Sequence, residues 1–325
     1  MNKNKNKIIA LQLSRIIACL MVFIVHLGQY LELKGIVRQF TDFGRFGVQL
    51  FFIMSGYLAA ISLSKKVDTK TYYKKRAIKI LPLYYFSILF LFIYHSILNS
   101  YFSYIPNDPY HLYWLRYIFL LNGFLPSKTF DFWNNLGITW TIPIFVFFYL
   151  IIPLLMKKIK GIKSSLIILI ITYLISLNPF YKCTIIEYLY IFFIGIFIFF
   201  CNKEKKNNEC TLFFTIIAII RLILEQIPYV ELLAIIIIVS TNIIIKASKK
   251  TQKIIDILDE HSYTLYLVHG IVIYEIIGYL DECHIIISHK MIFLIAIVFT
   301  PLFTYLIHKY IEKPIQNYLT KKLIQ

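Results

Sequence analysis

The sequence predicts an all-α polytopic membrane protein with about ten transmembrane helices and both termini in the cytoplasm. Three observations predict this fold class. First, 59% of the 325 residues are hydrophobic and only 16% are charged, whereas soluble domains carry roughly 45–50% apolar and 25% charged residues. Second, the apolar residues form long continuous runs, unlike the alternating pattern of a membrane β-strand. Third, the basic residues that flank these runs are distributed asymmetrically.

Apolar runs bounded by charged residues define the candidate spans, since a helix needs about 20 residues to cross the hydrocarbon core. The ten expected spans cover residues 8–30, 44–63, 79–98, 136–156, 164–180, 185–201, 211–226, 231–246, 262–280 and 290–308. The first run is too long for a signal peptide and lacks a small-residue cleavage site. We therefore expect a single transmembrane domain over residues 1–325, with no soluble catalytic domain.

The basic residues predict the orientation. With a cytoplasmic N-terminus, 25 of the 34 Lys and Arg fall in cytoplasmic segments and 7 in external segments, while Arg15 and Arg221 lie within spans. Cytoplasmic loops carry such an excess, so topology explains the net charge of +17, and we expect no nucleic-acid partner. The long external segment 99–135 is expected to lie along the outer surface or fold back as a lid, with Tyr113 and Trp114 at headgroup depth.

Several common chemistries lack support in this sequence. The five cysteines are scattered and show no CxxC or metal-ligand spacing, so neither a disulfide framework nor a metal site is expected. No GxxxxGK[ST], GxSxG or HExxH motif occurs. Nucleotide hydrolysis, serine-esterase chemistry and zinc-protease chemistry are therefore not indicated.

Two ionisable side chains, Arg15 and His26, lie within the first expected span. They are 11 residues apart, which places them about 20° from each other around the helix and about 16 Å apart along its axis. Both therefore project from one face, and a cation below a titratable imidazole suits a buried reaction site. The alternatives are that Arg15 extends to the membrane surface and that His26 hydrogen-bonds to a neighbouring helix.

A basic cluster precedes the third expected span. Arg76 and Lys79 are one helical turn apart and face the same way. They could hold a diphosphate or a 3′-phosphate through charge-assisted hydrogen bonds. The alternative is simple anchoring at the cytoplasmic surface.

Other candidates carry a weaker signal. Ser55, followed by Gly56, could be a nucleophile, but small residues here more readily indicate close helix packing. His269 lies about two turns into the ninth span, where a structural and a functional role are equally open. His95 and Arg221 lie near external span ends, where extension of the side chain to the surface is favoured.

These residues together resemble a bacterial family of membrane enzymes, acyltransferase family 3. Arg15 and His26 resemble its opening motif, Gly47–Leu58 resembles its GVxLFFxxSGxL stretch, and Arg76–Pro82 is similar to its RxxRixP motif. The remaining similarities are Trp140-Thr141-Ile142 with Phe148-Tyr149-Leu150 and Pro153 (WSLxxExxFYLxxP), and the closing signatures Ser262–His269 and Ile311–Pro314. The matches are spread over most of the chain and follow the family's order.

The resemblance implies an activity. Family members transfer an acyl group, commonly acetyl, from acyl-coenzyme A to a hydroxyl of a cell-surface polysaccharide, glycolipid or related acceptor, in the bacterial cytoplasmic membrane. With this activity, we expect His26 to act as general base and Arg15 to neutralise donor charge or a developing oxyanion. Arg76 and Lys79 would bind the donor, and no metal is required.

Two positions depart from the family pattern. Lys79 replaces the second arginine of RxxR, which keeps the charge but loses the planar fork. Phe145 replaces the glutamate of the WSLxxExxFYLxxP motif, so the function of that carboxylate is absent or supplied elsewhere.

Two other classes of protein stay open at this level. A transporter or flippase for a lipid-linked saccharide could use the same helices and an intramembrane Arg/His pair, although the sequence shows no inverted repeat and no matched pair of broken helices. In a sensor or an assembly partner, the alignment of Arg15 with His26 would have no function.

Overall fold

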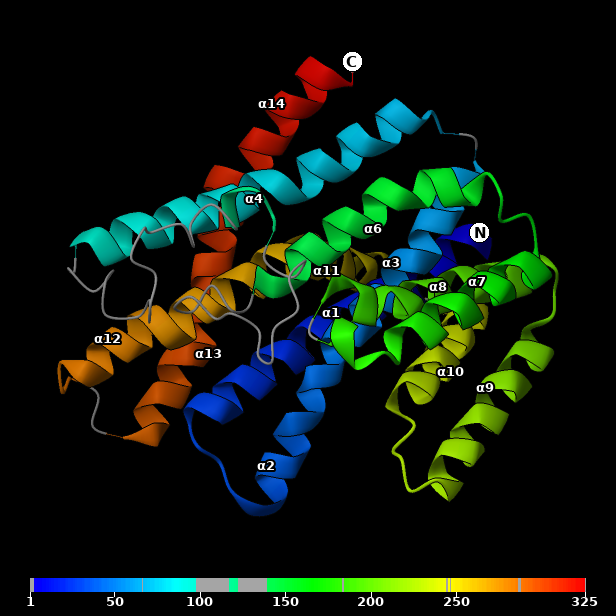
Figure 1. Ribbon diagram of the computed structural model, residues 1–325. Helices are drawn as coiled ribbons and strands as arrows, with labels where there is room; N and C mark the ends of the chain where they lie inside the picture. The colour runs from blue at the N-terminus through cyan, green and yellow to red at the C-terminus, as the bar shows by residue number, and fades with distance from the viewer. Residues whose placement is uncertain are drawn as a thin grey trace. The chain divides into compact units, whose positions relative to one another are not determined.

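The computed structural model describes residues 3–65, 67–97, 117–121, 139–182, 184–243, 245, 247–285 and 288–324. Within these ranges the chain forms helices joined by short connections and contains no strand (Figure 1). The all-α fold class is therefore confirmed. Most of the predicted external segment 99–135, including Tyr113 and Trp114, lies outside the described residues.

Outside the segment 98–140, the helices follow one another with few residues between them. In chain order they are α1 (Lys3–Tyr30), α2 (Gly35–Asp42), η1 (Phe43–Arg45), α3 (Phe46–Ser64), α4 (Thr69–Ile97), α6 (Thr141–Met156), α7 (Ile162–Ser176), η3 (Pro179–Tyr181), α8 (Ile185–Lys203), α9 (Asn207–Ile223), α10 (Tyr229–Asn242), α11 (Lys249–Gly270), η4 (Ile271–Ile276), α12 (Ile277–Glu282), α13 (His289–Ile307), η5 (His308–Glu312) and α14 (Lys313–Leu323). Two of these, η4 and η5, are π-helical turns.

Six stretches of the described chain are long and apolar enough to cross a membrane. They are Ile9–Tyr30, Gly35–Ser64, Thr69–Tyr94, Ile185–Lys203, Lys249–Asp281 and His289–Leu323. Each of the ten predicted spans overlaps a helix, but four of those helices (α6, α7, α9 and α10) have only 14 to 17 residues. A multi-pass membrane protein is supported, while the count of ten and the cytoplasmic termini stay predictions.

The helices form two compact units, and each unit is assembled from separate segments of the chain. The first unit contains Met1–Val67, Ile151–Ile175 and Tyr188–Tyr263. The second unit contains Asp68–Leu150, Ser176–Glu187 and Thr264–Gln325. The units are therefore not consecutive domains joined by a linker, and the prediction of one domain over residues 1–325 remains untested.

In the first unit, glycines allow α1 to approach the start of α3 closely. A side-chain carbon on Gly44 would overlap the carbonyl oxygen of Met21, and one on Gly47 would overlap the carbonyl oxygen of Ala18. Only glycine fits at such crossings, because its missing Cβ lets two backbones come together. The glycine of the predicted GVxLFF stretch therefore serves helix packing.

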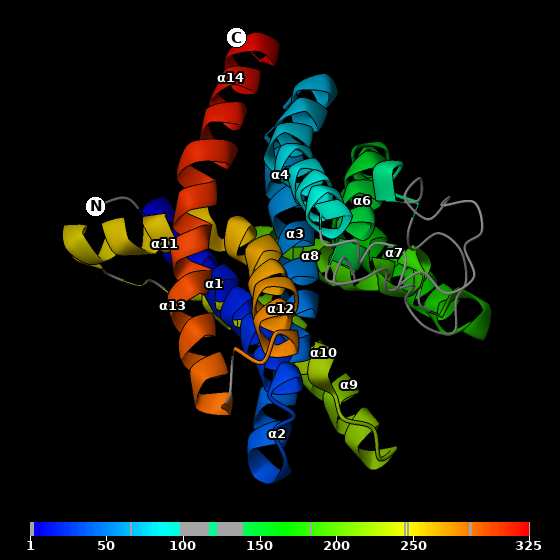
Figure 2. The same ribbon diagram turned by 90° about the vertical axis from the view of Figure 1, so that its left-hand side faces the viewer.

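In the second unit, α4 packs against α14 and η5, and α13 packs against η4 (Figure 2). The first turn of α4 is capped by Asp68, whose Oδ2 accepts a hydrogen bond from the backbone N–H of Thr71 at 3.0 Å. This backbone hydrogen bond lowers the pKa of the Asp68 carboxyl. The cap fixes where α4 begins, and with it the position of Arg76 two turns further along.

Candidate functional site

In the first unit, α1 presents a row of polar side chains to the N-terminal part of α11. Arg15 donates a hydrogen bond from Nη2 to Oδ2 of Asp259 over 2.6 Å, which makes an ion pair. One turn further along α1, the Sγ of Cys19 donates to the carbonyl oxygen of Ser262 at 3.2 Å. Arg15 is thus held by a carboxylate, while the alternative that its side chain extends to the membrane surface stays untested.

A second carboxylate extends this network one turn toward the start of α11. Gln12 donates from Nε2 to Oδ1 of Asp256 at 2.9 Å, and Gln252 donates to the same oxygen at 2.7 Å. The Nε2 of Gln12 also lies 3.3 Å from Oδ2 of Asp259. Oδ2 of Asp259 therefore accepts hydrogen bonds from both Arg15 and Gln12, and the two contacts hold the carboxylate that orients the guanidinium.

One hydrogen-bond donor of the Arg15 guanidinium does not take part in these contacts. Its Nε–H is buried and has no acceptor among the residues that the structure describes. An unsatisfied buried N–H is costly, and an oxygen of a bound reactant would satisfy it. The guanidinium is consequently oriented by Asp259 and keeps one donor that has no acceptor among the described residues.

His26 lies on the same uninterrupted helix as Arg15. α1 runs without a break from Lys3 to Tyr30, so the predicted spacing of about three turns applies. The His26 side chain is half-buried, and its imidazole is hydrogen-bonded to the side chain of Gln29. The structure keeps Arg15 and His26 in one unit and on one helix, without bringing the two side chains into contact.

Ser55 lies at a close crossing of α3 and α8. A side-chain carbon on Gly56 would overlap the carbonyl oxygen of Phe192, and one on Gly195 would overlap that of Ile53. This reciprocal contact of two glycines explains why small residues occur here. The packing interpretation of the Ser55-Gly56 pair is favoured, and a nucleophilic role of Ser55 stays an untested prediction.

In the second unit, the guanidinium of Arg76 lies against two aromatic rings. Its Cζ is 4.6 Å from the ring centre of Tyr149 and 5.3 Å from that of Tyr72. Both distances are within the range of cation–π attraction. Arg76 also lines a pocket of about 130 Å³, together with Tyr73, Ala77, Ile80, Leu81, Val146, Tyr149 and Leu150. The aromatic rings orient the cation at the edge of a largely apolar pocket.

Lys79 does not share this environment. Its side chain is exposed and is not among those that line the pocket, while its carbonyl oxygen accepts a hydrogen bond of 3.4 Å from Gln316. Arg76 lines the pocket and Lys79 does not, while the prediction that the two residues bind the donor as a pair stays untested. Arg76 is turned toward Tyr72 and Tyr149, since aromatic faces attract its planar cation more than they attract an ammonium in water.

Phe145 occupies the position at which the family motif has a glutamate. Its ring stacks on Tyr149, with ring centres 6.2 Å apart and an angle of 22° between the planes. The face of Tyr149 is also the surface on which Arg76 rests. The departure from the motif thus replaces a carboxylate with an aromatic layer next to the Arg76 site.

His269 is almost entirely buried, at 1% exposure. Its Nδ1 lies 3.1 Å from the carbonyl oxygen of Leu265, one turn earlier in the same helix. The neighbouring Tyr266 exchanges a hydrogen bond of 2.8 Å with the hydroxyl of Thr141 at the start of α6. Tyr266 therefore links α11 to α6, whereas the hydrogen bond of His269 stays within α11, so a structural and a functional role of His269 both stay open.

A polar cluster surrounds Glu312, and it was not predicted from the sequence. The carboxylate accepts hydrogen bonds from Thr264, from His308 Nδ1 at 2.7 Å and from Gln316 at 2.9 Å. Glu312 is 1% exposed, and a buried carboxylate needs such partners. Its occurrence in the closing signature was the available signal, and its environment shows that it joins α11, η5 and α14.

Arg221 has an ion-pair partner that the sequence did not indicate. Extension to the surface was favoured for this residue, but its Nε lies 2.9 Å from Oε1 of the buried Glu231, and Nη2 lies 3.3 Å from the hydroxyl of Tyr173. The pair joins α9 to α10, because an intramembrane charge is stabilised by a carboxylate partner. The side chain of His95, the companion prediction, lies outside the described residues.

Comparison with known proteins decides the class of the protein. A family model described as an acyltransferase domain, of acyltransferase family 3, matches residues 8–309. The chain belongs to this family. The match spans both compact units and establishes an acyltransferase that transfers groups other than aminoacyl groups, in place of a transporter or a sensor. No curated protein and no solved structure matches the chain.

Proposed function

We propose that this membrane acyltransferase transfers an acyl group, typically acetyl, from acyl-coenzyme A to a hydroxyl of a cell-surface polysaccharide, glycolipid or related acceptor. We place the enzyme in the bacterial cytoplasmic membrane as a multi-pass protein. The observation that carries the proposal is Arg15, which is oriented by Asp259 and keeps a buried N–H donor, on the helix that also carries His26. Oxyanion stabilisation requires such a preoriented donor in a site of low dielectric constant.

In the proposed reaction, His26 accepts the proton of the acceptor hydroxyl while the hydroxyl oxygen attacks the thioester carbonyl. The carbonyl oxygen becomes negatively charged, and Arg15 stabilises that charge. The carbon–sulfur bond then breaks, the sulfur leaves with its electron pair, and the imidazolium returns the proton to the thiolate. The products are the acyl ester and free coenzyme A, so atoms and charges balance.

Donor binding is proposed for Arg76. A guanidinium beside an apolar pocket could hold a phosphate of coenzyme A through charge-assisted hydrogen bonds. Lys79 is exposed one turn away on α4, and we retain it as a contributor of long-range charge only. The acceptor class is proposed by analogy with the family.

The test uses purified protein in detergent, radiolabelled acetyl-coenzyme A and a mixture of surface glycans. We expect His26→Ala to lower ester formation by about 10² to 10⁴-fold, the usual contribution of general base catalysis. His289→Ala, at the exposed start of α13, is the matched control and should retain full activity. Wild-type activity in His26→Ala would remove His26 from the mechanism.

The corresponding test of Arg15 compares two arginines that each pair with an aspartate in the first unit. Arg15→Ala should lower the turnover rate by about 10² to 10³-fold, as expected for loss of an oxyanion donor. Arg38 pairs with Asp42 on the short helix α2 at 2.9 Å, so Arg38→Ala controls for loss of an ion pair alone. Equal losses in both variants would show that Arg15 acts only in folding.

A further inference from the structure

The last helix, α14, is the final part of an apolar helical stretch that is longer than the thickness of the bilayer. The apolar stretch His289–Leu323 has 35 residues, or about 52 Å of helix against a hydrocarbon core of about 30 Å. The 19 residues of α13 already cover about 28 Å. We infer that α13 crosses the core and that α14 lies at the membrane boundary.

The exposed residues of this region combine lysine with tyrosine. The exposed lysines and tyrosines are Lys309, Tyr310, Lys313, Tyr318, Lys321 and Lys322, and Pro314, Ile315, Asn317 and Leu323 are also exposed. Tyr310 and Tyr318 are 64% and 62% exposed. The one carboxylate between residues 309 and 324 is Glu312, which is buried. The outer surface of the region therefore carries four positive charges and no negative one.

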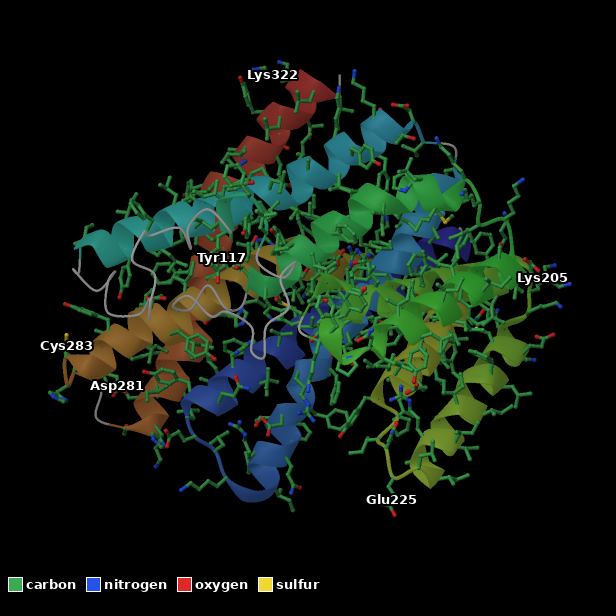
Figure 3. All side chains as sticks on the ribbon, viewed as in Figure 1. Tyr117, Lys205, Glu225, Asp281, Cys283 and Lys322 are labelled. Carbon is green, nitrogen blue, oxygen red and sulfur yellow. The ribbon has the colours of Figure 1, made fainter. Side chains whose placement is uncertain are left out.

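Two of these lysines place their ammonium groups close to the ring of a neighbouring tyrosine. Nζ of Lys309 lies 5.0 Å from the ring centre of Tyr310, and Nζ of Lys322 lies 5.7 Å from that of Tyr318. Figure 3 shows Lys322 on the last turn of α14, with its side chain extending outward from the ribbon. Such pairs hold the ammonium groups near aromatic rings, which themselves favour the headgroup layer.

The opposite face of α14 is fixed to α4 within the second unit. Gln316 donates to the carbonyl oxygen of Lys79 at 3.4 Å, and the ammonium of Lys74 donates to the carbonyl oxygen of Leu323. These two contacts set α14 antiparallel to α4. With one face held in this way, the lysine- and tyrosine-rich face stays directed outward.

We propose that this outer face of α14 binds the phosphate groups of anionic phospholipids. The positive-inside rule accounts for lysines after the last span, but it does not require them to share an exposed face with tyrosines. Basic clusters next to a membrane helix bind anionic headgroups, with a gain of about fivefold per lysine. The lysines and tyrosines of this surface take no part in the proposed reaction, so the proposal does not depend on it.

The test measures lipid binding by the full-length protein in phosphatidylcholine nanodiscs that contain phosphatidylglycerol as the anionic probe. A triple variant, Lys313→Gln with Lys321→Gln and Lys322→Gln, should lose enrichment of phosphatidylglycerol around the protein by at least about tenfold. The control changes Lys249, Lys250 and Lys253 to Gln at the exposed start of α11 in the first unit. The control should retain the enrichment.

Two further measurements keep the proposal open to refutation. Replacing the three α14 lysines with arginine should preserve the enrichment, and 0.5 M salt should abolish it in the wild type, because salt screens surface charges. Equal enrichment in the glutamine variant and the wild type, or an equal loss in the α11 control, would overturn the assignment. Displacement of the lipid by inorganic pyrophosphate at equal concentration would assign the face to soluble phosphates and also overturn it.

Discussion

Arg15 and Arg76 are both arginines on long apolar helices, but the two units surround them differently. Arg15 forms an ion pair of 2.6 Å with Asp259, whereas Arg76 lies against the rings of Tyr72 and Tyr149 and has no carboxylate partner among the described residues. An ion pair fixes the cation and offsets part of its charge. Aromatic rings fix the plane of the cation and leave its charge available to a ligand.

The different surroundings suit Arg15 and Arg76 to different functions, although the two residues look alike in the sequence. A fixed and partly neutralised guanidinium suits a short-lived oxyanion, because it needs no reorganisation during the reaction. An uncompensated guanidinium beside an apolar pocket suits an anionic donor that binds and leaves. Mutations that make the surroundings of Arg15 and Arg76 more alike test whether these surroundings cause the difference in function.

The largest effect is expected for Asp259→Ala. A carboxylate lost from a buried ion pair costs about 3–5 kcal/mol, and because the Arg15 side chain is 32% exposed we expect about 2 kcal/mol of unfolding free energy. The turnover rate should fall at least tenfold with little change in the donor KM, because Arg15 loses its orientation. Thermal unfolding and acyl-transfer rates measure the two effects.

Asp256→Ala provides the matched control for this variant. Asp256 lies one turn earlier in α11 and binds Gln12 and Gln252 rather than Arg15. Asp259→Glu should recover part of the turnover rate, since a longer carboxylate can still reach the guanidinium. Equal loss of turnover in Asp259→Ala and Asp256→Ala would refute a specific role of Asp259 toward Arg15.

An intermediate effect is expected for Arg76→Lys. The charge is kept, but the planar contact with Tyr149 and Tyr72 is lost, and cation–π contacts contribute about 0.5–2 kcal/mol. The KM for acyl-coenzyme A should rise about 3- to 30-fold while the turnover rate stays nearly constant. Steady-state kinetics with varied donor concentration measures the change, and a constant donor KM would exclude Arg76 from donor binding.

The smallest effect is expected for Phe145→Glu, which restores the residue type of the family motif. A carboxylate next to Tyr149 gives Arg76 a negative neighbour, so that its surroundings become more like those of Arg15. We expect a rise of a few-fold in the donor KM, because the carboxylate competes with donor phosphate for the cation. Phe145→Leu removes the ring without adding charge, and an equal rise in that variant would assign the effect to lost stacking.

Sequence patterns predicted the elements of the fold well and the partners of the polar residues poorly. Long apolar runs predicted where helices occur, because backbone polar groups in lipid must be satisfied within the helix. The same patterns favoured extension of Arg221 to the surface, yet Arg221 pairs with Glu231. Local sequence gives the face of one helix, but it does not give the residue on the neighbouring helix that meets that face.

The composition, the apolar runs and the spaced motifs of this sequence determined an all-helical membrane protein, its family resemblance and the alignment of Arg15 with His26 along one helix. These properties depend on hydropathy and helical periodicity, which are local. Only the tertiary structure decided that Asp259 holds Arg15, that two tyrosines hold Arg76, and that Glu312 joins three helical segments. Asp259, Tyr149 and Thr264 are far along the chain from the residues that they contact, and helix packing rather than periodicity brings them together.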